Sequence, residues 1–88
     1  MTREQFLAEL NTRFPLYNFF VERDGTKYTR VIRSSAGSAS SRSVYCFLDK
    51  DGNIYKAASW KAPVKGIRST LATVDLNRVD QHGGWMYR

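Results

Sequence analysis

The first fourteen residues place apolar side chains at helical spacing. Four of them recur at spacings of three and four residues and form one stripe: Phe6, Leu7, Leu10 and Phe14. This pattern predicts an amphipathic helix from Thr2 to Phe14. Thr2 suits the N-cap because its hydroxyl can accept a hydrogen bond from the first turn. Pro15 predicts the end of the helix, since the residue before a proline avoids helical backbone angles.

Apolar and polar residues then alternate from Leu16 to Arg33, with Asp24 and Gly25 in the middle. Asp-Gly is a strong signal for a two-residue turn, because a type I′ turn needs positive φ at both central positions. The segment therefore predicts a β-hairpin. A turn at this place gives three facing pairs: Val21 with Tyr28, Phe19 with Arg30, and Tyr17 with Ile32. That face is mostly apolar, and its arginine is expected to reach the edge of the sheet.

A second hairpin is predicted from Val44 to Ser59. Residues 44–48 form a nearly continuous apolar run, which is typical of a central strand buried on both faces. The turn is expected at residues 49–53, with Gly52 in the left-handed conformation. This register pairs Leu48 with Ile54 and Phe47 with Tyr55, so that it aligns apolar residues across the two strands.

The segment between the hairpins, Ser34 to Ser43, is small and polar, and six of its ten residues are serine. Low complexity of this kind predicts a flexible loop. One interpretation is a connector between the two hairpins. The other is a loop that orders around an anion through backbone N–H groups and hydroxyls, with Arg33 and Arg42 at its ends.

The last third of the chain has a weaker pattern. Trp60 to Leu71 is expected to be a loop with a short helical turn that packs Trp60 and Ile67 on the sheet. Leu71 to Arg88 is expected to be irregular, with a short strand at Gly84 to Arg88. The whole chain of 88 residues is long enough for one small domain. The predicted fold is α+β, with the N-terminal helix packed on an antiparallel sheet of about four strands.

Charge divides the chain unevenly. The net charge is +6, yet residues 26–70 alone have a balance of +7, and the remainder has a balance of −1. Only Asp49 and Asp51 oppose the basic residues of that region, which are Lys27, Arg30, Arg33, Arg42, Lys50, Lys56, Lys61, Lys65 and Arg68. A one-sided positive field attracts nucleic acid, nucleotides or acidic proteins. The alternative is a solvated surface that only keeps the protein in solution.

Several classes of function lack the residues they need. Cys46 is the single cysteine and His82 the single histidine, so neither a metal site nor a Cys–His nucleophile has enough partners. No pair of carboxylates is expected to meet across a cleft, and no Walker-type phosphate loop occurs. We therefore expect a non-enzymatic protein without a cofactor. A lone cysteine, which we expect to be buried, and the absence of a signal peptide or a long apolar run predict a cytoplasmic protein that does not enter a membrane.

The segment from Lys56 to Arg68 is the best candidate binding site. Its cations are Lys56, Lys61, Lys65 and Arg68, and its aromatic side chains are Trp60 and the adjoining Tyr55. Interleaved cations and aromatic rings are typical of sites that bind single strands or nucleotides, since the cations pair with phosphates and the rings stack on bases. Arg33 and Arg42 would extend the contact. Whether Trp60 belongs to the core or to the contact surface stays open at this stage, because tryptophan is usually buried.

The run from Ser43 to Arg68 resembles a family of small bacteriophage-encoded proteins without an assigned activity. The similar part is a strand, an Asp-Gly turn, and then Lys-Ala-Ala-Ser-Trp-Lys-Ala-Pro at residues 56–63. The resemblance implies a phage origin and a setting inside an infected bacterium, and it carries no catalytic residues. Three hypotheses follow: a binder of nucleic acid or a nucleotide, an effector that binds a host protein such as a defence component, and a structural or virion-assembly protein.

Overall fold

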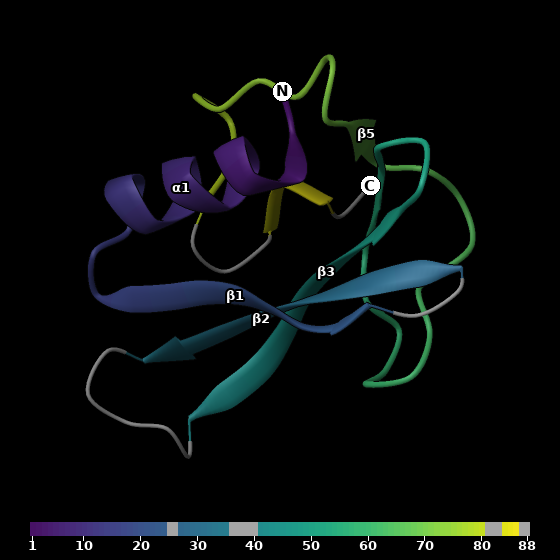
Figure 1. The fold of residues 1–88 in the computed structure, drawn as a ribbon, viewed down its shortest axis with the longest axis horizontal. Coiled ribbons are helices and arrows are strands. Elements are labelled where there is room, and N and C mark those ends of the chain that lie inside the picture. The colour runs from purple at the N-terminus through teal and green to yellow at the C-terminus, as the bar shows by residue number, and fades with distance from the viewer. Residues whose placement is uncertain (25–26, 36–40, 81–83, 87–88) are drawn as a thin grey trace.

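The computed structural model describes residues 1–24, 27–35, 41–80 and 84–86. One helix lies against an antiparallel sheet, and the C-terminal part of the chain runs beside both (Figure 1). In chain order the elements are α1 (Arg3–Arg13), β1 (Tyr17–Asp24), β2 (Tyr28–Ser35), β3 (Arg42–Asp49), β4 (Asn53–Tyr55), β5 (Ser69–Thr70) and the 3-10 helix η1 (Gly84–Met86). The sheet order is β1-β2-β3-β4-β5. The predicted α+β fold is confirmed, with five strands in place of about four.

Helix α1 forms where the apolar stripe predicted it. Thr2 is the N-cap, and its hydroxyl accepts a hydrogen bond from the backbone N–H of Gln5 at 3.1 Å. The Gln5 side chain accepts the N–H of Thr2 in return at 2.7 Å, which completes a capping box. Phe6 and Leu10 are fully buried. The helix ends at the C-cap residue Phe14, directly before the proline.

The register predicted for β1 and β2 is wrong. These strands pair Phe20 with Ile32 and Val21 with Val31. The register shifts after Val21, where a β-bulge adds one residue to β1. The strand then continues to Asp24, which therefore belongs to β1 and not to the turn, while Gly25 lies outside the described residues. The observed register aligns apolar residues on both faces of the pair, which a turn at Asp24-Gly25 does not.

The register predicted for β3 and β4 is confirmed. Leu48 pairs with Ile54 and Phe47 pairs with Tyr55. Gly52 has φ of +85°, the left-handed conformation that the turn requires. Four consecutive residues of β3 are buried, from Tyr45 to Leu48, as expected for a central strand. The boundaries of the serine-rich loop were too wide, because its first two residues belong to β2 and its last two to β3, and residues 36–40 are not described.

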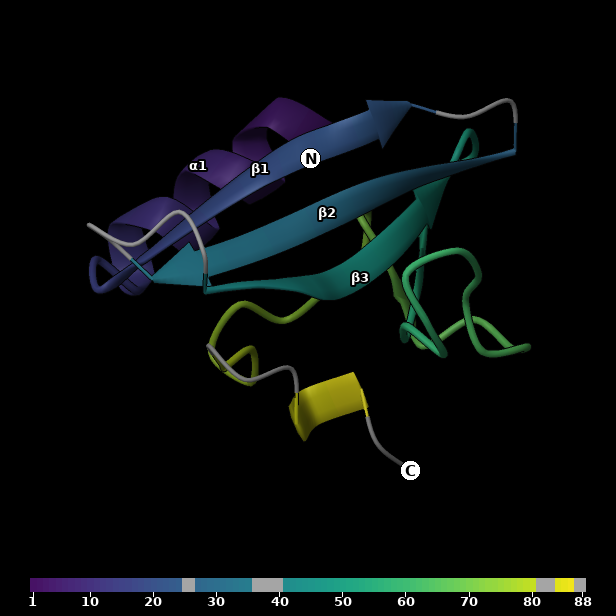
Figure 2. The same cartoon turned by 90° about the horizontal axis from the view of Figure 1, so that it is seen from below.

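The two faces of the sheet have different roles. The inner face packs against α1 and the C-terminal segment, and one cluster of buried side chains joins all three: Phe6, Leu10, Phe19, Val31, Tyr45, Cys46, Leu48, Ile54, Val79 and Met86. Figure 2 shows α1 lying behind β1 and β2. Side chains alternate along a strand, so Arg30 and Ile32 lie on the opposite, outer face from Val31.

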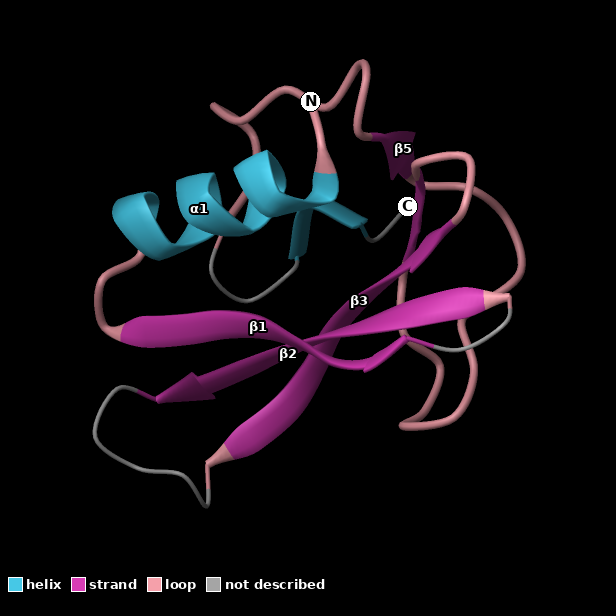
Figure 3. Cartoon of the chain, in the orientation of Figure 1, coloured by secondary structure: helices cyan, strands magenta, loops and turns pink. Residues whose placement is uncertain are grey.

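Two expectations for the last third of the chain are wrong. No helical turn forms between Trp60 and Leu71, where the chain is drawn as loop around the short strand β5 (Figure 3). Ile67 is 44% exposed, so it lies at the surface. Residues 84–86 form a 3-10 helix and not a strand, because the Asp80 carboxylate accepts the N–H of Gly84 at 2.9 Å and turns the chain. Residues 87–88 lie outside the described ranges.

Within the described ranges, no helix has the length and apolar character that crossing a membrane requires.

Candidate functional site

Trp60 lies at the tip of a hairpin-like loop that extends β4. Ala57 and Pro63 form an isolated antiparallel bridge, and the N–H of Val64 donates to the carbonyl of Lys56 at 2.8 Å. This backbone pairing places the tryptophan and the following Lys61 at the far end of the loop. The Trp60 side chain is 43% exposed. It therefore lies on the surface, and of the two alternatives the core position is excluded.

Two arginines from the outer face of the sheet reach the Trp60 ring. The guanidinium carbon of Arg30 lies 5.5 Å from the ring centroid, and that of Arg42 lies 6.0 Å away. Cations at this distance are attracted by the electrons of the ring face. The side chain of Arg30 is only 14% exposed, so its charge is largely desolvated. The loop tip is thus held at the sheet by cation–π contacts.

Glu22 supplies the counter-charge. Its carboxylate pairs with Arg42, and Arg30 lies 3.7 Å from its other oxygen. The β-bulge in β1 explains this position, because Glu22 is the extra residue and a bulge re-aims the side chain it carries. We call Glu22, Arg30, Arg42 and Trp60 the arginine–tryptophan cluster. Its formal charge is +1, and it combines an exposed ring with two guanidinium groups.

Several lysines of the basic region form no ion pair with any described residue. Within the residues that the structure describes, no ion pair involves Lys27, Lys50, Lys61 or Lys65. Lys61 and Lys65 are exposed, whereas Lys56 is half-buried. Gly66, next to Lys65, has φ of +100°, so the backbone bends there in a way that a side chain would resist. The loop consequently presents uncompensated positive charge to solvent.

Asp49 forms no ion pair with these described lysines, and its carboxylate instead accepts hydrogen bonds within its own turn. Burial alone would raise its pKa, but hydrogen bonds from Asn53, Tyr55 and the N–H of Asp51 outweigh that effect and lower the pKa below its usual value. The Tyr55 hydroxyl donates to this carboxylate at 2.8 Å, which raises the pKa of the tyrosine. The Tyr55 ring packs edge-on against Tyr28, with centroids 5.3 Å apart. Tyr55 is thus fixed at the turn.

Two predicted site residues are not brought to the cluster. Arg33 pairs with Phe19 and lies on the inner face, where its guanidinium stacks over Tyr17 at 4.9 Å. It is therefore on the opposite face of the sheet from Arg42. The backbone N–H of Arg68 donates to the carbonyl of Ile54 at 2.8 Å, and the residue lines a separate pocket.

Sequence reasoning missed Glu22 and did not assign Arg30 to the site. The sequence did contain one signal: Arg30 lies within a strand of apolar residues, and a cation in such a place needs a partner on the same face of the sheet. Among the described residues, no three His, Cys, Asp or Glu side chains are grouped so that they could hold a metal ion, and His82 lies outside those residues. Cys46 is fully buried, as predicted, and burial raises the pKa of its thiol.

Comparison with known proteins adds a family but no activity. A family model described as a family of unknown function (DUF7717) matches residues 2–88. No curated protein and no solved structure matches the chain. The family match includes α1, all five strands and the loop that carries Trp60, so the candidate site lies within it. The chain therefore belongs to DUF7717, a family of unknown function.

Proposed function

We propose that this chain is a non-enzymatic binding protein for single-stranded nucleic acid. The contact surface would be the arginine–tryptophan cluster together with the lysines of residues 56–65. The observation that carries the proposal is Trp60, a 43% exposed ring at a loop tip with two guanidinium groups beside it. This exposure leaves part of the Trp60 ring accessible to a base that could stack on it.

The chemistry of the surface fits a single strand better than a duplex. An unpaired base offers a flat face that stacks on an aromatic ring, whereas the bases of a duplex are covered by each other. Arginine pairs with phosphate oxygens through two parallel hydrogen bonds and also stacks on bases. Lys61 and Lys65 supply further charge for the backbone between bases.

The resemblance of Ser43–Arg68 to small phage-encoded proteins extends this proposal. On that ground we propose that the protein acts in the cytoplasm of an infected bacterium, where phage and host single strands occur. That part of the proposal rests on the resemblance alone, and the binding test below is independent of it.

The test is fluorescence anisotropy with a labelled oligothymidylate at two salt concentrations. Four phosphate contacts would give about 50-fold weaker binding on going from 50 to 200 mM salt. Trp60→Leu removes the stacking ring and should weaken binding by roughly tenfold or more, since one stacked base contributes on the order of 1–3 kcal/mol. Lys61→Gln should weaken binding more than Arg13→Gln, the matched loss of one positive charge on α1.

Absence of binding at 50 mM salt would exclude the proposal. Equal losses of affinity for Lys61→Gln and Arg13→Gln would instead show that only the net charge of the protein matters. The arginine–tryptophan cluster and its loop would then not be the binding surface.

A further inference from the structure

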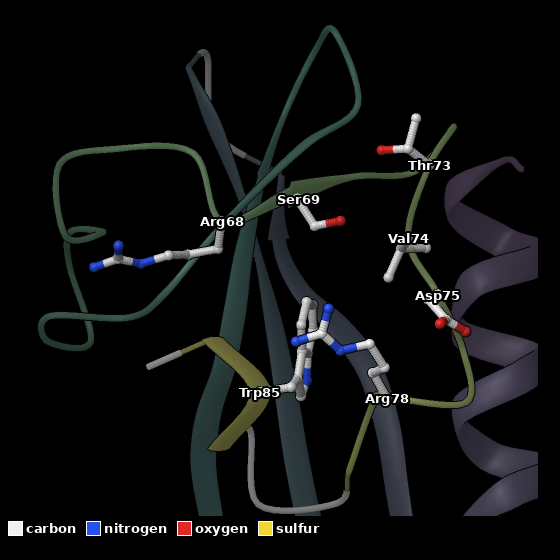
Figure 4. Close-up of a pocket in the computed structure, with 7 residues that line it drawn as sticks. All are labelled: Arg68, Ser69, Thr73, Val74, Asp75, Arg78 and Trp85. Carbon is white, nitrogen blue, oxygen red and sulfur yellow. The ribbon is translucent and has the colours of Figure 1, made fainter. Parts of the chain in front are cut away.

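A second pocket lies apart from the arginine–tryptophan cluster, where the C-terminal segment meets β5. It has a volume of about 330 Å³ and is lined by Arg68, Ser69, Thr73, Val74, Asp75, Arg78 and Trp85. Figure 4 shows Arg78 extending toward Trp85, whereas Arg68 extends away from the other labelled side chains. Arg78 is therefore the cation that the pocket offers to a ligand.

The aromatic wall of this pocket is held rigidly. The indole N–H of Trp85 donates to the Tyr45 hydroxyl at 2.9 Å, and that hydroxyl donates to the carbonyl of Asp80 at 2.6 Å. Trp85 is half-buried and packs against the main core cluster. Its ring thus has a fixed orientation before any ligand arrives, which is the condition for a good stacking surface.

The polar wall is also preformed. The N–H of Asn77 donates to the Asp75 carboxylate at 3.0 Å, and the N–H of Arg78 donates to the Asp75 carbonyl at the same distance. This turn fixes the backbone that carries Asp75 and Arg78, and both residues line the pocket together with Ser69 on β5. Arg78 forms no ion pair with any described residue.

We propose that this pocket binds a nucleoside monophosphate. Arg78 and the Ser69 hydroxyl would bind the phosphate, because a guanidinium and hydroxyl donors are the usual partners of phosphate oxygens. Trp85 would stack on the base, and the Asp75 carboxylate would accept the ribose hydroxyls, as acidic residues do in nucleotide sites. The volume is at the lower end for small-molecule pockets, which fits one nucleotide. The negative charge of Asp75 would repel further phosphate groups, so a monophosphate is favoured over a diphosphate or triphosphate.

This site is distinct from the surface proposed for nucleic acid. Trp85 belongs to the group of side chains that packs with α1 on the inner face, whereas Arg30 and Arg42 hold Trp60 at the outer face. The two tryptophans are the only ones in the chain. Each therefore reports on one site, and the two proposals can fail separately.

The test uses the full chain with Trp60→Phe, so that Trp85 is the only indole. Adenosine 5′-monophosphate is titrated by Trp85 fluorescence and by calorimetry, with adenosine and inorganic phosphate as comparison ligands. We expect saturable quenching by the nucleotide and at least tenfold weaker binding of adenosine. Arg78→Gln should weaken nucleotide binding at least tenfold, whereas Arg13→Gln, the same charge change on α1, should leave it within twofold.

Two results would overturn the inference. One is a flat titration by both methods with the folded protein, verified by circular dichroism. The other is an equal effect of Arg78→Gln and Arg13→Gln. Oligonucleotide binding that depends on Trp60 without any mononucleotide response would exclude this pocket and leave the nucleic-acid surface standing.

Discussion

The Tyr45 hydroxyl links three parts of the chain, and its removal should have a large effect on stability. Tyr45→Phe deletes one atom that donates to the Asp80 carbonyl and accepts the indole N–H of Trp85. The tyrosine is 5% exposed, and burial raises the pKa of its hydroxyl, so the group acts as a neutral hydrogen-bonding partner at every ordinary pH. The deletion leaves a donor and an acceptor without this partner.

The expected loss follows from these two bonds. A hydrogen bond contributes about 1 kcal/mol net, and a buried group left unsatisfied costs about 1–3 kcal/mol. Both partners are only partly buried, so water can replace some of the lost bonding, and we expect about 2 kcal/mol. In a domain of this size that lowers Tm by roughly 8–16 °C. The m-value should not change, because the surface exposed on unfolding is the same.

The measurement is urea unfolding followed by circular dichroism, with Tyr28→Phe as the matched control. Tyr28 is half-buried and its ring packs against two other rings, as the buried Tyr45 ring packs against Phe19, but no hydrogen bond of its hydroxyl joins it to a described residue. It should lose less than about 0.5 kcal/mol, as most substitutions away from special features do. A double-mutant cycle with Trp85→Phe should give a coupling of about 1 kcal/mol. Equal losses for the two tyrosines, together with an additive cycle, would refute the reasoning.

Two further predictions concern the edge of the sheet and its first turn. Asn11 donates to the Phe19 carbonyl at 3.0 Å and accepts the Phe19 N–H at 2.8 Å, so its amide covers the open edge of β1. Asn11→Ala should lower the free energy of unfolding by about 1 kcal/mol, even though alanine has the higher helix propensity. It should also promote self-association, measured by light scattering, because the edge of β1 is then uncovered. The control Thr12→Ala should have neither effect. Asp49 has a lowered pKa in the folded state, so it contributes stability above about pH 4, and that contribution is lost as the pH falls further. Urea midpoints of Asp49→Asn should therefore be below those of the unaltered protein at pH 7 and approach them near pH 3, and a constant difference would contradict this.

Local signals predicted the parts of the fold that are locally determined. The helix follows from its apolar spacing and from the cap at Thr2, and the register of β3 and β4 follows from a short turn with Gly52 at positive φ. The C-terminal segment could not be predicted in this way. Its conformation depends on Tyr45, which is 35 residues from Asp80 and 40 from Trp85 in the sequence. A hydrogen bond between such distant residues leaves no periodic pattern.

The candidate site depends on two bulges that no local pattern indicated. The pairing of β2 with β3 shifts by one residue at Tyr45, which lies between the pairs Val31–Cys46 and Ile32–Val44. A shift of one residue moves every following side chain to the other face of the sheet. Without it, Arg42 would lie on the inner face with Arg33.

The same extra residue therefore has two consequences. It turns Tyr45 into the core beside Cys46, where its hydroxyl can hold the C-terminal segment, and it turns Arg42 outward to Arg30 and Trp60. The bulge in β1 completes the arrangement, because it aims Glu22 at the two arginines. The sequence alone could locate the basic region of the chain, because counting charged residues does not require knowing how the strands pair. Which of its arginines meet around the tryptophan is decided by backbone irregularities, and these become visible only when the strands are paired.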